Sequence, residues 1–346
     1  MKRNLYGLIV SCMLGLFLIS LGINIYFFKN SKLQQDNYPK IDDKMTLDNH
    51  QDEYVWVATM TDISMYLNND QEALRRFGRE YGVKVTVAGP KQYDIPGQIE
   101  AMEEVIKRKP AGIMVLGMET SLIPVVNKAV DAGIPTITVD ADLVGSKRMA
   151  HVGSNWYDIG VKQAEAVVKL TGGKGKVAIM GIGGADNMQA GFQGFKNVIK
   201  EYKDITLIGE YDDMANVKES RRITLEIIKE HPDIAAISGF DSNSGPGIAQ
   251  AIKELDKVGK IKVTCVDMEP EHIKLLKQGV VQKLIGQKRK LFTYYGAKLL
   301  YDLNHSNLKI TSNDKYNGVT NIPYIIDTGL IEVDNTNVDS IVEGTY

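Results

Sequence analysis

The feature that most constrains the fold of this 346-residue chain is a regular alternation of short apolar runs with longer helical patterns. The apolar runs begin with YVWVATM at Tyr54 and include TITVD, KVAIMGI and IKVTCVD. Between them lie segments such as GQIEAMEEVIKRKPAG, in which Ile99, Met102 and Val105 fall on one helical face. Short apolar strands that alternate with helices form parallel sheets covered on both faces. The pattern therefore predicts an α/β protein.

The length of the alternating region predicts more than one core. About 290 residues follow the first 53, which suits two lobes of ordinary domain size. The strand–helix units fall into two groups, so we expect two similar lobes, each with its own parallel sheet. In open α/β sheets the binding crevice lies beyond the carboxyl ends of the strands. A ligand is therefore expected in a cleft that both lobes line.

The N-terminal segment has the properties of a membrane span. Residues from Leu5 to Phe28 carry no charge and are mainly apolar. A helix of this length can cross the hydrocarbon core with some tilt, and the two basic residues before it favour a cytoplasmic N-terminus. We predict that residues 1–29 form a single transmembrane anchor, followed by a polar spacer over residues 30–53. The binding domain is then expected on the extracytoplasmic side of the cell membrane.

A removable or lipid-modified signal is the alternative to a permanent anchor. A cleavable signal has a shorter apolar core and ends in a small-x-small site, whereas this run is long and ends in INIYFFKN. A lipid-bearing cysteine should follow the apolar core, whereas Cys12 lies near its start. Both alternatives remain open at this point.

Charge and motif content argue against nucleic-acid binding and catalysis. Lysine and arginine total 41 against 43 acidic residues, and no basic stripe is present. The glycines of KVAIMGIGGADN follow a strand, but Asp186 stands where a dinucleotide motif needs its third glycine. The five histidines are scattered, and Cys265 lies alone in an apolar strand. We expect no enzyme, no metal ion and no cofactor.

Polar residues at the predicted strand ends are the candidate ligand contacts. They are Thr59, Asp62, Asp140, Asp142, Asp241, Asp267 and Gln287. Carboxylates accept hydrogen bonds from vicinal hydroxyls, and amides both donate and accept, so the set suits a neutral, hydroxyl-rich ligand. Tyr66 and Trp156 offer flat faces for the apolar side of a sugar ring. Each residue alone also fits a structural role, because strand-end carboxylates often cap helices.

The order and content of these segments resemble the type I periplasmic binding proteins, in the branch for ribose, xylose and related sugars. The resemblance covers the region from Tyr54 to about Asp334 and rests on several motifs taken together. They are GIMVLGMETSLIPVVNKAVDAGIPTITVDADL, SKRMAHVGSNWYDIG, GFDSNSGPGIAQAI, VTCVDMEPE and GVVQKLIGQKRKLFTYYGAKLL. It implies sugar-contacting roles for Asp140, Asp241, Asp267 and Gln287, and for polar residues near Ser154 and Asn155.

The resemblance also implies how the lobes are divided. The N-terminal lobe would comprise residues 54–155 and 288–320. The C-terminal lobe would comprise residues 156–287 and 321–346. A hinge would join two Rossmann-like lobes with parallel sheets, and the lobes would close on the sugar.

The sequence departs from the family pattern at several positions. Ala190 in NMQAGF stands where the family often has an arginine, and Asn187 and Gln189 are candidate replacements. Trp156 follows Asn155 where ribose binders use a small polar side chain. These differences imply a pocket with more stacking surface and a pentose, such as xylose, as the ligand.

Two roles fit a closing sugar receptor at a membrane. The chain resembles membrane-anchored xylose-binding proteins that partner sensor histidine kinases in two-component systems, and a permanent anchor suits that role. The alternative is the solute-binding receptor of an ABC sugar transporter, which must be free to dock on its permease. The N-terminal anchor predicted for residues 1–29 favours the sensor.

Overall fold

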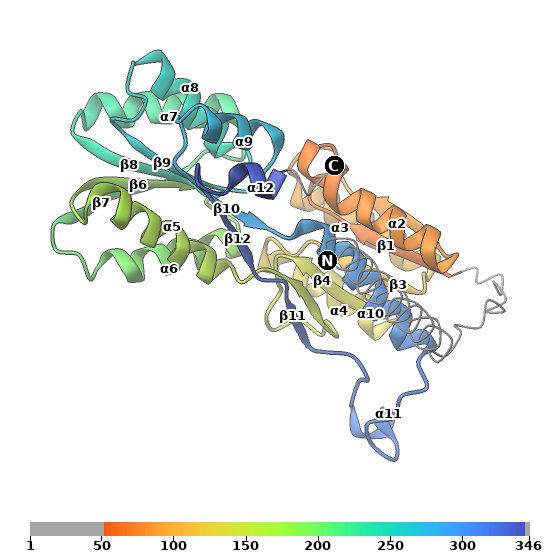
Figure 1. The fold of residues 1–346 in the computed structure, drawn as a ribbon. Helices are drawn as coiled ribbons and strands as arrows, with labels where there is room; N and C mark the ends of the chain where they lie inside the picture. Colours follow the sequence, from red (N-terminus) through yellow and green to blue (C-terminus); the bar gives the residue numbers. More distant parts are fainter. Residues whose placement is uncertain (1–51, 343–346) are drawn as a thin grey trace, which may run out of the picture. The chain divides into compact units, whose positions relative to one another are not determined.

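The computed structural model describes residues 52–342. The predicted anchor, residues 1–29, and nearly all of the spacer, residues 30–53, lie outside the described part of the chain. No helix within residues 52–342 is long and apolar enough to cross a bilayer. These residues form two α/β lobes, so the two-lobed fold with parallel sheets expected from the alternating pattern is confirmed (Figure 1).

The first lobe contains a parallel sheet with the strand order β11-β5-β4-β3-β1-β2. The strands are β1 (Glu53–Val57), β2 (Lys84–Ala88), β3 (Gly112–Val115), β4 (Thr136–Asp140), β5 (His151–Gly153) and β11 (Ile325–Asp327). The helices are α2 (Gln71–Tyr81), α3 (Ile95–Arg108), α4 (Ile123–Asp131) and α10 (Phe292–His305). Side chains alternate across the sheet. Tyr54 and Trp56 of β1 share a core with residues of α2 and α10, whereas Val55 and Val57 pack with α3 and α4.

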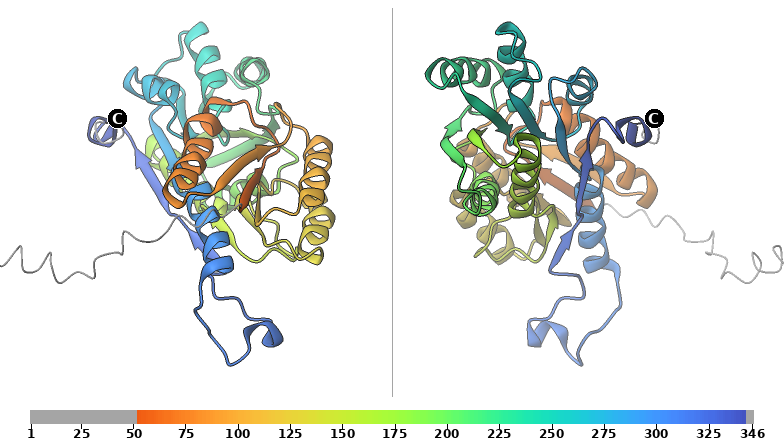
Figure 2. Two further views of the ribbon diagram at one scale, coloured as in Figure 1. Left: turned by 90° about the vertical axis from the view of Figure 1, so that its right-hand side faces the viewer. Right: turned by 60° about the vertical axis from the view of Figure 1, so that its left-hand side comes forward.

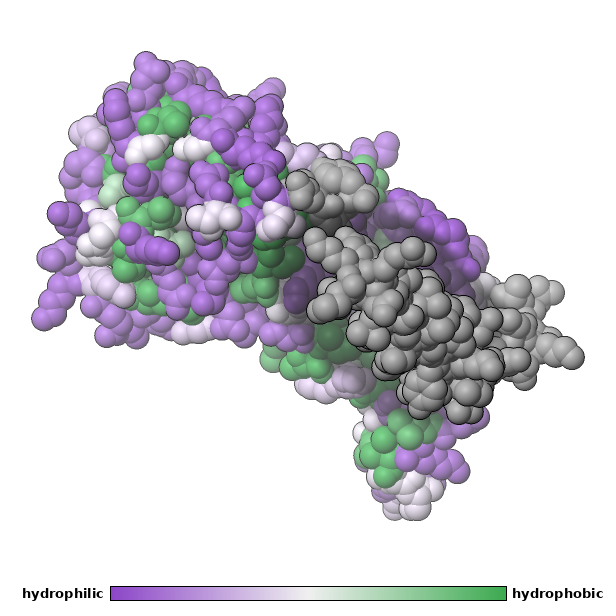
Figure 3. Space-filling model, viewed as in Figure 1, coloured by the Kyte–Doolittle hydropathy of each residue, from purple (hydrophilic) through white to green (hydrophobic). Residues whose placement is uncertain are grey.

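The second lobe repeats this arrangement, with the strand order β12-β10-β9-β8-β6-β7. The strands are β6 (Gly175–Gly181), β7 (Ile205–Asp212), β8 (Ile234–Gly239), β9 (Lys262–Val266), β10 (Lys283–Gln287) and the antiparallel β12 (Leu330–Val333). The helices are α5 (Trp156–Thr171), α6 (Asp186–Ile199), α7 (Val217–Glu230), α8 (Ser244–Glu254), α9 (Pro270–Lys277) and α12 (Val338–Val342). The surface of this lobe that faces the viewer in Figure 3 is mainly hydrophilic, with small hydrophobic patches.

The chain passes between the lobes three times: after β5, after β10, and between β11 and β12. The position of the third passage differs from the predicted lobe boundary. The resemblance predicts residues 321–346 in the C-terminal lobe, but β11 pairs in parallel with β5 of the first sheet. The chain therefore belongs to the first lobe as far as Asp327, because β5 supplies backbone hydrogen-bond partners for β11. Between α10 and β11, the segment with α11 (Asp314–Asn317) projects from the first lobe (Figure 2).

Helices α5 and α6 approach each other through glycines. A Cβ atom built on Gly160 would lie 1.8 Å from the carbonyl oxygen of Gly191, and one on Gly194 would lie 2.1 Å from that of Tyr157. Backbone atoms cannot give way as a flexible side chain can. The sequence thus places glycine where two helix backbones touch.

We expect Gly160→Ala to lower the free energy of unfolding by about 3 kcal/mol, the upper end of what overpacking costs. Urea unfolding monitored by circular dichroism would measure the loss. Gln193→Ala, at an exposed position of α6, is the control and should change stability by less than about 0.5 kcal/mol. An unchanged Gly160→Ala variant would mean that the helices can separate at little cost.

Candidate functional site

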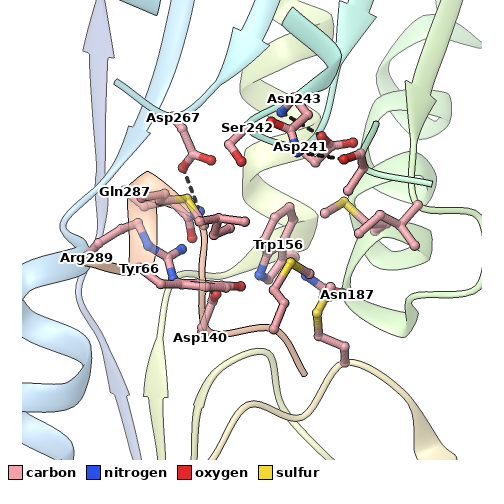
Figure 4. Close-up of a pocket in the computed structure, with 17 residues that line it drawn as sticks. Tyr66, Asp140, Trp156, Asn187, Asp241, Ser242, Asn243, Asp267, Gln287 and Arg289 are labelled. Atoms are coloured by element: carbon pink, nitrogen blue, oxygen red, sulfur yellow. Dashed lines mark hydrogen bonds and ion pairs between the residues drawn. The ribbon is translucent and has the colours of Figure 1, made fainter. Parts of the chain in front are cut away.

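A pocket lies between the two lobes at the carboxyl ends of their strands (Figure 4). Its open space is about 410 Å³. The polar or aromatic residues that line it are Tyr66, Asp140, Trp156, Asn187, Asp241, Ser242, Asn243, Asp267, Gln287 and Arg289. The apolar ones are Met60, Ile63, Met65, Met118, Ile182, Met188 and Ala215. Seven of the residues proposed from the sequence are in the first group.

Asp140 and Asp267 occupy equivalent places in the two lobes. Asp140 ends β4 and Asp267 follows β9, and each of these strands is third in the order of its sheet. Both residues have left-handed backbone conformations, with φ of 69° and 74°. Aspartate tolerates this region better than most residues. The repeated strand–turn geometry brings the two carboxylates into one pocket from opposite lobes.

Arg289 organises the first-lobe side of the pocket. Its guanidinium donates to both carboxylate oxygens of Asp70, at 2.9 and 3.1 Å, and to Oδ2 of Asp140 at 2.8 Å. It also lies over the ring of Tyr66, 4.9 Å from the centroid. Tyr66 and Asp70 are the first and last residues of one short π-helix, η1 (Tyr66–Asp70). Because Arg289 follows β10, this cluster ties the second passage between the lobes to the first lobe.

The acidic groups around Arg289 are strongly affected by burial. Burial raises the pKa of Asp70 to about 7, and the charge of Arg289 opposes that rise. Burial also raises the pKa of Asp267 to about 7, again against the attraction of Arg289. One guanidinium therefore serves several carboxyl groups in a site shielded from water.

Four buried polar atoms of the pocket have no hydrogen-bond partner among the described residues. They are Oδ1 of Asp140, Nε1 of Trp156, Oδ1 of Asn187 and Oε1 of Gln287. Buried polar atoms are nearly always paired, so their common position indicates a ligand site. Three of the atoms accept hydrogen bonds and one donates. The complementary ligand supplies several hydroxyl donors and at least one oxygen acceptor.

Asp241, which lines the pocket, also forms a carboxyl pair with the buried Asp213. The hydroxyl of Ser244 lies 2.7 Å from Oδ2 of Asp213 and 2.6 Å from Oδ2 of Asp241. A hydroxyl has one proton, so it can donate to only one of the two carboxylates. Burial and the neighbouring charge of Asp241 raise the pKa of Asp213 to about 8.

We expect Asp213→Asn to stabilise the protein at pH 9 but not at pH 5. The raised pKa of Asp213 gives a stabilising contribution that is present below about pH 4 and is lost as the pH rises to about 8. Asparagine carries its own donor to Ser244 at every pH, so the gain at pH 9 should be on the order of 1–3 kcal/mol. Urea unfolding at the two pH values measures it. The control Asp204→Asn, on an exposed turn, should change the free energy of unfolding little at either pH. An equal gain from Asp213→Asn at both pH values would contradict the arrangement in which the Ser244 hydroxyl donates to only one of the two carboxylates.

Five residues proposed from the sequence do not line the pocket. Thr59 is buried and donates to Gln98 at 2.6 Å. Asp62 is exposed, and Gln189 lies on the surface, where its amide donates to the carbonyl of Gly183.

Asn155 and Asp142 also have structural partners. The side chain of Asn155 caps α5 by accepting from the backbone N–H groups of Tyr157 and Asp158. Asp142 pairs with Arg148; burial alone would raise the pKa of Asp142, but the bonds from Arg148 and its other partners lower it. Both side chains therefore have structural partners in this arrangement, and neither lines the pocket.

Arg289, Asp70 and the methionines of the pocket are not among the residues predicted from the sequence. Arg289 lies two residues after Gln287, in a passage between the lobes, and this spacing is the one sequence signal for it. Asp70 gave none, because it lies within a helical stretch and contacts the pocket only through Arg289.

The two lobes touch on both sides of the pocket. The backbone N–H of Asp186 donates to the carbonyl of Met118 at 2.8 Å, and the N–H of Thr120 donates to Oδ2 of Asp186 at 2.7 Å. On the other side, Nδ2 of Asn69 donates to Oε1 of Glu269 at 2.9 Å. The structure therefore has the closed arrangement of the lobes.

Comparison with known proteins identifies this architecture. Residues 54–306 match the periplasmic binding protein domain. The chain belongs to this family. It is 24% identical to the D-allose-binding periplasmic protein of Escherichia coli over 245 residues, which are 68% of this chain and 78% of that protein. As a member, it is a solute-binding receptor and not an enzyme, and its binding domain lies outside the cytoplasm.

Solved structures of family members superpose on both lobes. AraP, an arabinose binding protein from Geobacillus stearothermophilus, is 29% identical with a TM-score of 0.70, covering 84% of this chain and 99% of its own. A sugar-binding protein of a sugar ABC transporter from Bacillus halodurans is 26% identical with a TM-score of 0.75, covering 84% and 99%. The expected fold is thereby confirmed at the level of the family.

Proposed function

We propose that the chain is an extracytoplasmic receptor that closes around a monosaccharide. The unpartnered acceptors of Asp140, Asn187 and Gln287 and the donor of Trp156 carry this proposal. A sugar supplies adjacent hydroxyls for the acceptors and ring or hydroxyl oxygens for the donor. A hydrogen bond to a charged group such as Asp140 contributes about 1.5–3 kcal/mol, and each bond to a neutral group contributes about 0.5–1.5 kcal/mol. Together with burial of the sugar ring, these bonds support micromolar affinity after the cost of ordering.

A pentose, such as xylose, is the proposed ligand class. The pocket is small, and part of its lining consists of Met60, Met118, Ile182 and Met188. These side chains offer no hydrogen-bond partner to the hydroxymethyl group of a hexose, and an unpaired buried hydroxyl costs about 1–3 kcal/mol. The arabinose-binding relative supports the same size class.

Isothermal titration calorimetry with a panel of sugars tests the proposal. The full chain in detergent would be titrated with D-xylose, L-arabinose, D-ribose, D-allose, D-glucose and D-galactose. We expect at least one pentose to bind with micromolar or tighter affinity, and hexoses to bind about tenfold or more weakly. No heat from any sugar would refute the receptor function, and a preference for hexoses would refute the ligand class alone.

We further propose that sugar-driven closure is read by a membrane histidine kinase of a two-component system, with residues 1–29 as the anchor. The uncharged run from Leu5 to Phe28 supports this role, because an anchored receptor can act only on partners in the same membrane. Mass spectrometry of the membrane-extracted protein should then find an intact Met1 end. A shortened or lipid-bearing end would contradict the anchor.

Delivery of sugar to an ABC permease is the second candidate, favoured by the likeness to the Bacillus halodurans transporter protein. Deleting the gene separates the two roles. A sensor predicts loss of sugar-induced transcription while a separate transporter still takes up the sugar. Loss of uptake with induction preserved would establish the transport role.

A further inference from the structure

The projecting segment of the first lobe, residues 306–324, carries exposed hydrophobic side chains. It lies between α10 and β11 and contains α11 (Figure 2), and Figure 3 shows hydrophobic residues on it. Fourteen large hydrophobic side chains are exposed within residues 52–342, and five of them lie in this segment or on the first residue of β11. Each is more than half exposed: Leu308, Ile310, Tyr316, Tyr324 and Ile325. Such an accumulation marks a contact with another protein or with a membrane.

The projecting segment has a defined local fold that uses its acidic group internally. Oδ1 of Asp314 accepts from the hydroxyl of Thr311 at 2.6 Å, and Oδ2 accepts from the N–H of Ile310 at 3.0 Å. Nδ2 of Asn317 donates to the Thr311 hydroxyl at 3.1 Å. The segment contains two lysines and this one acidic residue, and Lys309 is exposed. Its formal charge is therefore slightly positive.

The described chain begins beside the root of the projecting segment. Oδ2 of Asp52 lies 2.8 Å from Nε2 of His305, the last residue of α10. Nearby, Nδ2 of Asn304 donates to the hydroxyl of Tyr54 at 3.3 Å. The uncharged run from Leu5 to Phe28 ends 23 residues before Asp52, and a chain of that length spans about 80 Å at most. A membrane anchor in this run therefore joins the lobe at the end that carries the projecting segment.

The chemistry and position of the segment favour a lipid surface as its partner. Segments at the bilayer interface combine aliphatic side chains, tyrosine and lysine, and this segment has all three. A slightly positive charge suits the negative potential of anionic lipids. Tyr324, at the base, already packs on Arg148, whose guanidinium lies 4.5 Å from the ring centroid. The side chains offered to lipid are therefore those of Leu308, Ile310 and Tyr316.

We propose that the projecting segment rests on the extracytoplasmic surface of the membrane and inserts Leu308, Ile310 and Tyr316 into the lipid interface. The proposal rests on the anchor proposed above for residues 1–29. Anchor and segment together hold the first lobe on the bilayer at two points. The sugar pocket lies at the carboxyl ends of the strands, whereas the segment precedes β11 at the opposite edge of the sheet. The pocket then faces away from the lipid, and the second lobe is free to move during closure.

Quenching of tryptophan emission by brominated lipid tests the proposal with the full chain in vesicles. The two native tryptophans, Trp56 and Trp156, are buried, so Tyr316→Trp adds a reporter that bromine can reach. Tyr202→Trp is the matched control, because Tyr202 is exposed on the second lobe just before β7. The vesicles would contain phosphatidylcholine and phosphatidylglycerol, with or without bromine on the upper acyl carbons. Retention of the chain on the vesicles after an alkaline wash reports the anchor separately.

We expect brominated lipid to reduce the added emission of Tyr316→Trp by about half, because interfacial side chains lie about 5–10 Å into the headgroup and acyl boundary. The emission of Tyr202→Trp should not change. Adding Leu308→Asp/Ile310→Asp to Tyr316→Trp should abolish the quenching. Adding Leu255→Asp/Val258→Asp, at exposed apolar positions of the second lobe, should preserve it.

Three results would overturn the lipid contact while the anchor stands. One is unquenched emission from a chain that remains on the vesicles after the wash. Another is a blue-shifted but unquenched emission, because the segment would then be covered by protein, either a second copy or another part of the chain. The third is equal quenching of both tryptophan variants, which would show that the first lobe is not oriented on the bilayer. A wild-type chain that the wash releases would refute the anchor, and the attachment at two points with it.

Discussion

Replacing Arg289 by methionine is expected to lower the free energy of unfolding by about 3–5 kcal/mol at pH 8, the cost of leaving buried charges without their partner. Arg289 makes three hydrogen bonds to Asp70 and Asp140, and all three side chains are almost fully buried. Methionine fills a similar volume but offers no donor. Urea unfolding at pH 8 and pH 5 would measure the loss.

The loss should be smaller at pH 5. Burial raises the pKa of Asp70 to about 7 even with Arg289 beside it, and removing that positive charge raises the pKa further. A carboxyl whose folded pKa lies above its unfolded value stabilises the protein below the unfolded pKa, and this contribution disappears as the pH rises. At pH 5 Asp70 is protonated in the variant, so fewer unpaired charges remain buried.

Asp70→Asn in the same chain should recover part of the loss caused by Arg289→Met. Residues that share a hydrogen-bond network have coupling energies of about 0.5–3 kcal/mol, which the double-mutant cycle measures. Arg76→Met, at an exposed ion pair of α2, is the matched control and should cost less than about 1 kcal/mol. A loss at Arg289 no greater than this would show that water reaches the cluster.

The fold could be predicted because its signal is periodic and repeated. The apolar run TITVD is β4, which is buried throughout, and KVAIMGI overlaps β6, which is buried from Val177 onward. β11 gave no such signal, because two of its three residues are exposed at the sheet edge. The sequence therefore does not locate the last lobe boundary, because pairing at a sheet edge depends on the neighbouring strand more than on composition.

The site could be predicted only where a strand end determines the direction of a side chain. Asp140 and Asp267 follow buried strands and line the pocket, as expected. Asp142 and Asn155 have the same residue types but are occupied by Arg148 and by the first turn of α5. Sequence alone does not separate these cases, because the competing partner is brought in by tertiary structure.

The cluster of Arg289, Asp70 and Asp140 could not be predicted from the sequence either. Asp70 and Asp140 are 70 residues apart in the chain, and Arg289 lies a further 149 residues on. A buried arginine needs several acceptors, and here a π-helix, a strand end and an inter-lobe passage supply them. No local pattern connects these segments, so only the folded arrangement shows that they form one unit.

We expect Asp140→Asn and Asp267→Asn each to weaken sugar binding about 10- to 100-fold, as loss of a hydrogen bond to a charged group implies. Asparagine suits the left-handed backbone at both positions, with φ of 69° and 74°, whereas alanine would add backbone strain. At Asp140, Oδ2 is bonded to Arg289 and Oδ1 is free for the ligand. The side-chain amide of asparagine has a single acceptor oxygen, which cannot serve both Arg289 and a hydroxyl of the ligand.

Calorimetric titration of each variant with the best-binding sugar would measure the effect, and thermal unfolding would confirm that each variant folds. Asp142→Asn is the control, because Asp142 lies two residues from Asp140 but pairs with Arg148 outside the pocket. It should lower stability and leave the affinity within about twofold. Full affinity in Asp140→Asn and Asp267→Asn would mean that the two strand-end carboxylates do not hold the ligand. Equal losses in all three variants would indicate a general disturbance of the sheet edge. A loss confined to Asp140 and Asp267 requires that the sugar is held from both lobes at once, which is the condition for ligand-driven closure.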